Sequence, residues 1–218
     1  MPKKKSLIGI FLILALLIGC ATSPPLRPVL REDIKVPAGT IERNQFSGIR
    51  YPFKISAPPN WKMSTEFPDF LGELGYYKPS ADEKEQTELY IFNPVTKSNI
   101  QIDLTPANPY SEFSQQLQES RVTKVTTSLV EELHQDYGKD LPVDEGPAEA
   151  ISLKGIQYAA KKYVTYTVQN VKREQGWIYG FTEPYQLFIL YMILEKEGTN
   201  DREDMKRILD SYEFVSQK

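Results

Sequence analysis

One ten-residue stretch, residues 185–194 (YQLFILYMIL), constrains the fold more than any other part of the chain. It is almost continuously apolar, and it is far shorter than the roughly 20 apolar residues that span a bilayer as a helix. Its length is typical of a strand that is covered on both faces. A domain built around such a strand needs material on both sides of its sheet, which predicts a layered structure with residues 185–194 at the sheet centre.

Alternating segments in the first half predict strands beside this central one. Apolar and polar side chains alternate over residues 50–57 and again over residues 100–104, which is the period of a half-buried strand. Residues 88–92 lie between them and are followed by Asn93-Pro94, a turn signal. The order predicts an antiparallel hairpin.

Two further strands are predicted in the second half. Residues 155–171 are rich in Tyr, Val and Thr, and residues 176–181 repeat aromatic side chains on one face, a composition that favours strands. Residues 173–176 between them are expected to form the turn, so that the two segments pair antiparallel.

A long helix is predicted between these groups of strands. Asn108 is expected to cap it, with Pro109 at the first helical position, where a missing amide does no harm. Apolar residues then recur at helical spacing up to Tyr137, and Gly138 is expected to end the helix.

A short helix is predicted near the C-terminus, where Asn200 and Glu203 resemble a capping box. The pattern as a whole predicts an α+β fold. An antiparallel β-sheet is expected to pack against one long and one short helix in α/β/α sandwich-like layers.

The N-terminus resembles the precursors of bacterial lipoproteins. Three lysines, Lys3 to Lys5, precede 12 uncharged residues, Leu7 to Ile18, a length within the usual core of a secretory signal. Leu17-Ile18-Gly19-Cys20 then resembles a lipobox. The resemblance implies that residues 1–19 are a signal peptide removed in the mature protein.

The same resemblance implies that Cys20 carries a covalent lipid with acyl chains such as palmitate. Cys20 is the only cysteine of the chain, so no disulfide can form within one molecule. One acyl chain binds a membrane reversibly, whereas two or more anchor stably. Because Ala21 rather than aspartate follows the cysteine, the resemblance favours the periplasmic face of the outer membrane in a Gram-negative cell.

Residues 20–45 are expected to be the lipidated cysteine and a Pro-rich tether, and residues 46–218 a single globular domain. The tether region contains Pro24, Pro25, Pro28 and Pro37 without a sustained apolar period. About 25 residues at roughly 3 Å each would reach at most about 75 Å. The alternative is that residues 34–41 pack against the domain as an edge strand.

Charge argues against a nucleic-acid partner. Without residues 1–19, which contain three lysines and no acid, the chain has 23 basic and 29 acidic residues and a net charge of −6. Binding to nucleic acid depends on clustered Lys and Arg that neutralise phosphates. No such cluster interleaved with aromatic residues follows Cys20.

Catalytic and metal signals are sparse. His134 is the only histidine, with Glu131, Glu132 and Asp136 close in sequence, and it lacks a second His or a free Cys for a zinc site within one chain. No Gly-x-Ser-x-Gly motif is present either. We therefore expect no cofactor, no metal and no catalytic residue, with a small envelope hydrolase as an alternative.

Aromatic side chains are the remaining indication of binding. Trp177, Tyr179, Tyr76 and Tyr77 lie next to charged or turn residues, and exposed Trp and Tyr are preferred anchors of protein interfaces. They are candidate partner-binding residues. Packing in the core or between strands is the alternative interpretation.

The two ends of the predicted domain resemble a known family. YPFKISAPPNW (residues 51–61) and ILDSYEF (residues 208–214) are similar to the ends of PsbP/Mog1-like domains, which include envelope proteins of the DcrB and LpqN kind. The resemblance implies an accessory or binding module without a shared catalytic set. We therefore expect a lipid-anchored envelope protein that holds a protein partner or envelope component near the membrane, or alternatively a carrier of a small apolar ligand.

Overall fold

The ten-residue apolar run forms the central strand of the larger of two sheets. The computed structural model describes residues 36–76, 78 and 87–215, and it places β11 (Tyr185–Leu194) between β6 (Asn99–Pro106) and β10 (Val171–Thr182). The predicted sheet centre is therefore confirmed. Across the eight-stranded sheet the order is β4 (Lys62–Ser64), β5 (Leu89–Phe92), β6, β11, β10, β9 (Tyr158–Val168) and β7 (Val143–Glu145), and β8 (Glu149–Ala150) also pairs with β9.

The second sheet has four strands in the order β1 (Gly39–Glu42), β2 (Gln45–Gly48), β3 (Phe53–Ser56) and β12 (Glu213–Phe214). Its last strand brings the end of the described chain beside β3. All pairs of named strands in the described residues are antiparallel. The β5–β6 hairpin predicted around Asn93-Pro94 is confirmed.

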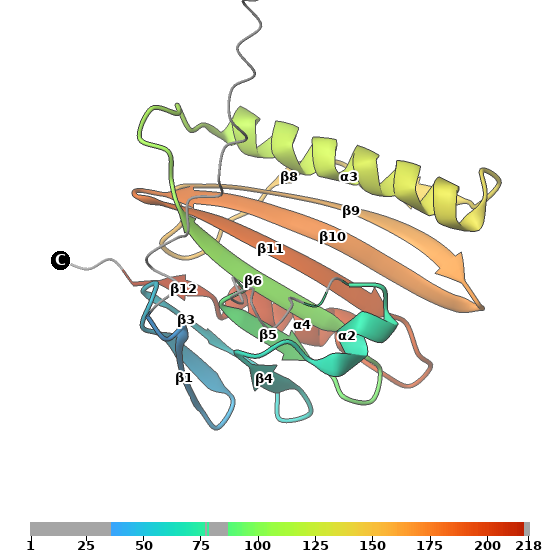
Figure 1. Ribbon diagram of the computed structural model, residues 1–218, viewed down its shortest axis with the longest axis horizontal. Helices are drawn as coiled ribbons and strands as arrows, with labels where there is room; N and C mark the ends of the chain where they lie inside the picture. The colour runs from blue at the N-terminus through green and yellow to red at the C-terminus, as the bar shows by residue number, and fades with distance from the viewer. Residues whose placement is uncertain (1–35, 77, 79–86, 216–218) are drawn as a thin grey trace, which may run out of the picture. The chain divides into compact units, whose positions relative to one another are not determined.

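Helices lie on both faces of the larger sheet (Figure 1). The long helix α3 (Gln115–Tyr137) packs on β9 and β10, whereas the short helix α4 (Asp201–Asp210) packs on β11 and on β3 of the smaller sheet. A third, five-residue helix, α2 (Asp69–Glu73), follows β4. The α+β class with one long and one short helix is confirmed. None of the helices that the structure describes has the length and apolar character of a membrane span.

Two hydrophobic cores follow from the alternation of β11. Leu187, Ile189 and Tyr191 face the core shared with α4 and the smaller sheet, and each is at most 1% exposed. Phe188 and Leu190 face α3 and are only partly buried. Both faces of β11 are covered, which explains the continuous apolar run. The side chains that face α4 are more completely buried than those that face α3.

The long helix begins later than its sequence signal indicates. Ser114, not Asn108, is the N-cap, and its hydroxyl accepts a hydrogen bond from the amide of Leu117 at 3.2 Å. Asn108 instead closes a turn, since its side-chain oxygen accepts from the amide of Tyr110 at 3.0 Å. The dipeptide Asn-Pro is compatible with both a helix start and a turn. The predicted end is confirmed, because Gly138 has a φ of 98°, which favours glycine.

The turn between β9 and β10 was also predicted in the wrong place. It lies at Gln169 and Asn170, both with positive φ, at 53° and 61°, the conformation of a two-residue hairpin turn. Residues 173–176 are paired strand residues in the middle of the sheet. Their polar side chains belong to the interior rather than to a loop.

Two smaller corrections concern the ends of elements. The first strand, β1, begins at Gly39, whereas the sequence predicts a domain that begins at Phe46. Residues 39–45 therefore belong to the smaller sheet and its first turn. This agrees with the alternative prediction of an edge strand within residues 34–41, which β1 overlaps. The helix at Asp201 is confirmed, but the side chain of Asn200 makes no capping hydrogen bond. Cys20 and the signal-like segment lie outside the described residues.

Candidate functional site

A groove of about 430 Å³ lies on the α4 face of the larger sheet. One wall is α4 and the other is the segment of residues 149–153, and the floor consists of residues of β9, β10 and β11. We call this cavity the α4 groove. Its volume lies within the range of about 300–1,000 Å³ that is usual for small-molecule sites.

A tyrosine lying across a glycine forms the floor of the groove. Gly176 pairs with Tyr191 of the adjacent strand, and a Cβ on Gly176 would lie 2.5 Å from the Tyr191 ring. The absence of a side chain at Gly176 thus leaves the space that the ring fills. The Tyr191 hydroxyl donates to Glu174 Oε1 at 3.0 Å, and burial, together with Glu174, raises the pKa of Tyr191 above its ordinary value.

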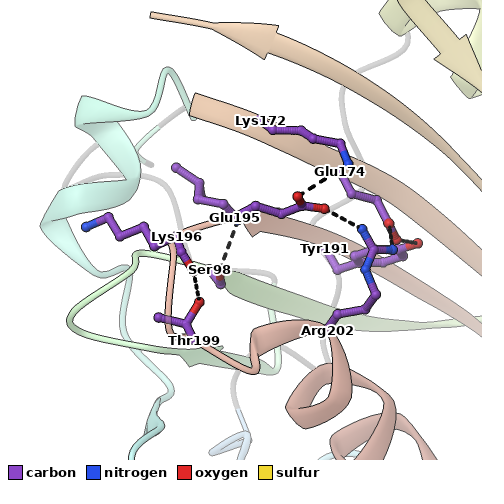
Figure 2. A network of polar contacts seen from close by, with 9 residues as sticks. Ser98, Lys172, Glu174, Tyr191, Glu195, Lys196, Thr199 and Arg202 are labelled. Carbon is purple, nitrogen blue, oxygen red and sulfur yellow. Dashed lines mark hydrogen bonds and ion pairs between the residues drawn. The ribbon is translucent and has the colours of Figure 1, made fainter. Parts of the chain in front are cut away.

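A buried carboxylate links the floor to the α4 wall, as Figure 2 shows. The Glu174 side chain is 4% exposed, and its second oxygen accepts from Arg202 of α4. Arg202 also donates to Glu195 at 2.7 Å, and Lys172 lies 3.3 Å from the same carboxylate. The hydrogen bond from Arg202 is the main reason that the pKa of Glu195 is lowered. Glu174 is therefore paired with a cation and hydrogen-bonded, as a buried charge requires.

The N-terminal end of α4 is fixed by a second buried carboxylate. Asp201 is 3% exposed and accepts from Ser98 Oγ at 2.6 Å and from Asn93 Nδ2 at 2.9 Å. Ser98 Oγ in turn accepts from the amide of Leu194 at 3.0 Å. These contacts connect the N-terminal end of α4, one wall of the groove, to the β5–β6 turn and to the end of β11.

One cation that lines the groove, Lys161, makes no side-chain hydrogen bond to a described residue. Lys161 Nζ lies 5.2 Å from the ring centre of Tyr163 and 5.7 Å from that of Tyr191. Its ion-pair partner is Glu149, whose carboxylate oxygen lies 4.0 Å away, beyond hydrogen-bond distance. The other lysine of the groove, Lys206, is paired with Asp210 at 3.0 Å. Among the described residues that line the cavity, Lys161 is thus the cation whose side chain makes no hydrogen bond to another described residue.

The sequence did not single out Lys161, Glu174 or Arg202. Glu174 has no local signal, because its sequence neighbours Lys172, Arg173 and Gln175 are polar, and this composition predicts a turn at residues 173–176. Arg202 and Lys161 have no local signal, since their partners come from other elements.

The candidate interface aromatics are not brought together on an exposed surface. Trp177 is 8% exposed and belongs to the core beneath α3, so it does not present its indole ring to a partner, and core packing explains it. Tyr179 is partly buried, with its ring 5.1 Å from that of Phe188 and near the guanidinium of Arg121. The Tyr76 hydroxyl is buried. Tyr77 lies outside the described residues.

His134 lies on α3, whereas the α4 groove lies on the opposite face of the sheet. Its Nε2 atom is 3.2 Å from the carbonyl oxygen of Leu141, a contact that ties the end of the helix to the following turn. No group of His, Cys, Asp and Glu suited to a metal ion occurs within residues 36–76, 78 and 87–215.

Replacing Trp177 with alanine is expected to lower the free energy of unfolding by about 3–5 kcal/mol, the usual cost of removing a buried aromatic ring. Tyr179→Ala is the matched control on the same face and should cost less, because Tyr179 is only partly buried. Urea unfolding of both variants measures the difference. Wild-type stability in Trp177→Ala would contradict the core position of this ring.

No protein-family model and no curated protein sequence matches the chain. Solved structures do match it. A cyanobacterial PsbP from Synechocystis sp. PCC 6803 is 10% identical, with 83% of this chain and 94% of that chain covered and a TM-score of 0.47. LpqN, involved in cell envelope biogenesis of Mycobacterium tuberculosis, is 14% identical over 76% of this chain and 84% of that chain, with a TM-score of 0.45.

A third match is a protein from Bacteroides thetaiotaomicron, 10% identical, with 81% of this chain and half of that chain covered and a TM-score of 0.47. PsbP and LpqN are the kinds of protein that the sequence resembles at the two ends of its domain. Similarities at these identities and TM-scores transfer no function to this chain.

Proposed function

We propose that this chain is a lipid-anchored binding or accessory protein of the bacterial cell envelope, and that it acts without catalysis by holding a protein partner or envelope component near the membrane. The observation that carries the proposal is Leu17-Ile18-Gly19-Cys20, placed directly after a signal-like apolar segment. A protein of this type would leave the cytoplasm and remain attached through the lipid on Cys20.

The geometry of the described domain supports a binding role. Its clearest cavity is an open groove between α4 and the sheet, and the charged side chains of that groove are engaged in structural ion pairs at Glu174 and Arg202. A hydrolase would need a nucleophile beside a base. His134, the only histidine, contacts a backbone carbonyl oxygen on the other face of the sheet.

A second candidate function is a carrier of a small apolar ligand. The α4 groove lies beside the short helix, where Met205, Leu209 and Ile193 contribute apolar side chains. This cavity is the specific observation that favours a carrier.

Replacing Cys20 with alanine tests the anchor in the full-length chain expressed in a Gram-negative cell. The wild-type protein is expected in the membrane fraction even after a high-salt wash, because two or more acyl chains anchor stably. Cys20→Ala should appear in the soluble fraction or accumulate as an uncleaved precursor. Cell fractionation and the mass of the N-terminal peptide measure both outcomes.

Two controls make this test decisive. Release of wild type and Cys20→Ala alike by high salt would show an electrostatic attachment and contradict lipidation. Ala21→Asp, which retains the cysteine, is expected to stay lipidated but to move from the outer to the inner membrane. An unchanged distribution would contradict the proposed outer-membrane location.

A further inference from the structure

We infer that the α4 groove binds an amphipathic carboxylate, with the carboxylate at Lys161 and an alkyl chain along the apolar surface between α4 and residues 149–153. The inference deepens the proposed binding function and rests on it. It names the class of the ligand, which is a single-chain molecule with one anionic head group.

Lys161 supplies the charge for the head group. Its side chain is 25% exposed, it donates no hydrogen bond to a described residue, and its ammonium group lies near the rings of Tyr163 and Tyr191. The rings favour a cation at this position but accept no ordinary hydrogen bond. A carboxylate that reaches Lys161 would therefore gain charge-assisted hydrogen bonds that the free protein leaves unmade.

The neighbouring charges favour one orientation of an anion. Arg202 is already paired with Glu174 and Glu195, so its charge is balanced within the protein. Glu203 and Asp210, on α4, are exposed at the rim. They repel an anion from the α4 side. Glu149 forms an ion pair with Lys161 at 4.0 Å without a hydrogen bond, so a ligand carboxylate would displace Glu149 from Lys161.

The rest of the groove suits an alkyl chain. Met205 and Ile193 are 3% and 2% exposed in the free protein, and Leu209 and Ile151 are partly buried beside them. Tyr191, which forms the floor, is held in place by Gly176 and Glu174. The apolar surface that remains exposed in the groove comes mainly from Leu209 and Ile151. A flexible chain lying on it would remove that surface from water without disturbing the buried ion pair.

Photo-crosslinking of the full-length protein in isolated membranes tests the inference. The probe is dodecanoate with a diazirine in its chain, and the matched control probe is the dodecylamine with the same diazirine. Dodecanoate is expected to label peptides from residues 149–153 and 201–210, and excess unlabelled dodecanoate should abolish the labelling. The amine should label these peptides about tenfold less, because its charge is repelled by Lys161.

Three variants separate the role of Lys161 from general effects. Lys161→Gln is expected to reduce dodecanoate labelling about tenfold, Lys161→Arg should restore most of it, and Lys206→Gln, which removes a paired lysine of the same groove, should leave it nearly unchanged. Equal labelling by both probes, or unchanged labelling in Lys161→Gln, would overturn the inference. Membrane retention in the Cys20→Ala experiment is measured separately, so failure of the ligand assignment and failure of the proposed anchor are distinguishable.

Discussion

Replacing Ile189 with aspartate is expected to unfold the domain. Ile189 is fully buried in β11, the strand between β6 and β10, and it faces the core shared with α4 and the smaller sheet. An unpaired carboxylate at this position costs several kcal/mol, comparable with the roughly 5–15 kcal/mol that stabilises a typical domain. Circular dichroism and urea unfolding of the purified variant should show loss of the cooperative transition, or aggregation during expression.

Leu190→Asp is the matched control for this experiment. Leu190 is the next residue of the same strand, but it faces α3 and is only partly buried, so water can reach a carboxylate there. It should cost clearly less stability than Ile189→Asp. Equal losses in the two variants would contradict the different burial of the two faces of β11.

The comparison of these two residues shows what the sequence could reveal about the fold. A strand covered on both faces appears as a continuous apolar run, and this pattern correctly predicted β11 at the sheet centre and the layers on either side of it. The pattern did not indicate which face is buried more completely. That difference depends on α4 and on the smaller sheet, whose strands β1, β2 and β3 lie far from β11 in sequence.

The errors in the prediction have a common physical origin. Glu174 was assigned to a turn because isolated segments with charged side chains usually lie at the surface. In the folded chain Tyr191 and Arg202 compensate its burial, and these residues come from β11 and α4. Local sequence contains no information on such partners, so the polar part of the α4 groove was not predictable.

Trp177 was predicted as a candidate for an exposed binding residue, but its side chain is buried. It lies beside Gly176 and Gln175, which made an exposed indole plausible, yet the strand continues through all three residues. The alternation of a strand then places Trp177 on the face that α3 covers. Partner binding through Tyr179 and Tyr76 stays a prediction.

Alkaline pH is expected to destabilise the domain strongly. Burial raises the pKa of Tyr191 and Tyr212 above the ordinary value near 10. Above that value the unfolded chain loses phenolic protons that the folded chain keeps, so the free energy of unfolding falls as pH rises. Each such tyrosine contributes a slope of up to about 1.4 kcal/mol per pH unit. Urea unfolding at pH 8, 10 and 11 should therefore show little change in stability below pH 9 and a steep loss above pH 10.

Tyr212→Phe isolates the contribution of one tyrosine. The Tyr212 side chain is fully buried, and its hydroxyl has no hydrogen-bond partner among the described residues, so removing the oxygen should cost little at pH 7 or even increase stability. Unfolding of the variant should release one proton fewer above pH 10. The free energy of unfolding should therefore fall less steeply with pH, by up to about 1.4 kcal/mol per pH unit. A slope equal to that of the wild-type protein would mean that the Tyr212 phenol ionises as readily in the folded chain as in the unfolded one. The burial of the Tyr212 ring against Phe53 of β3 would then be wrong.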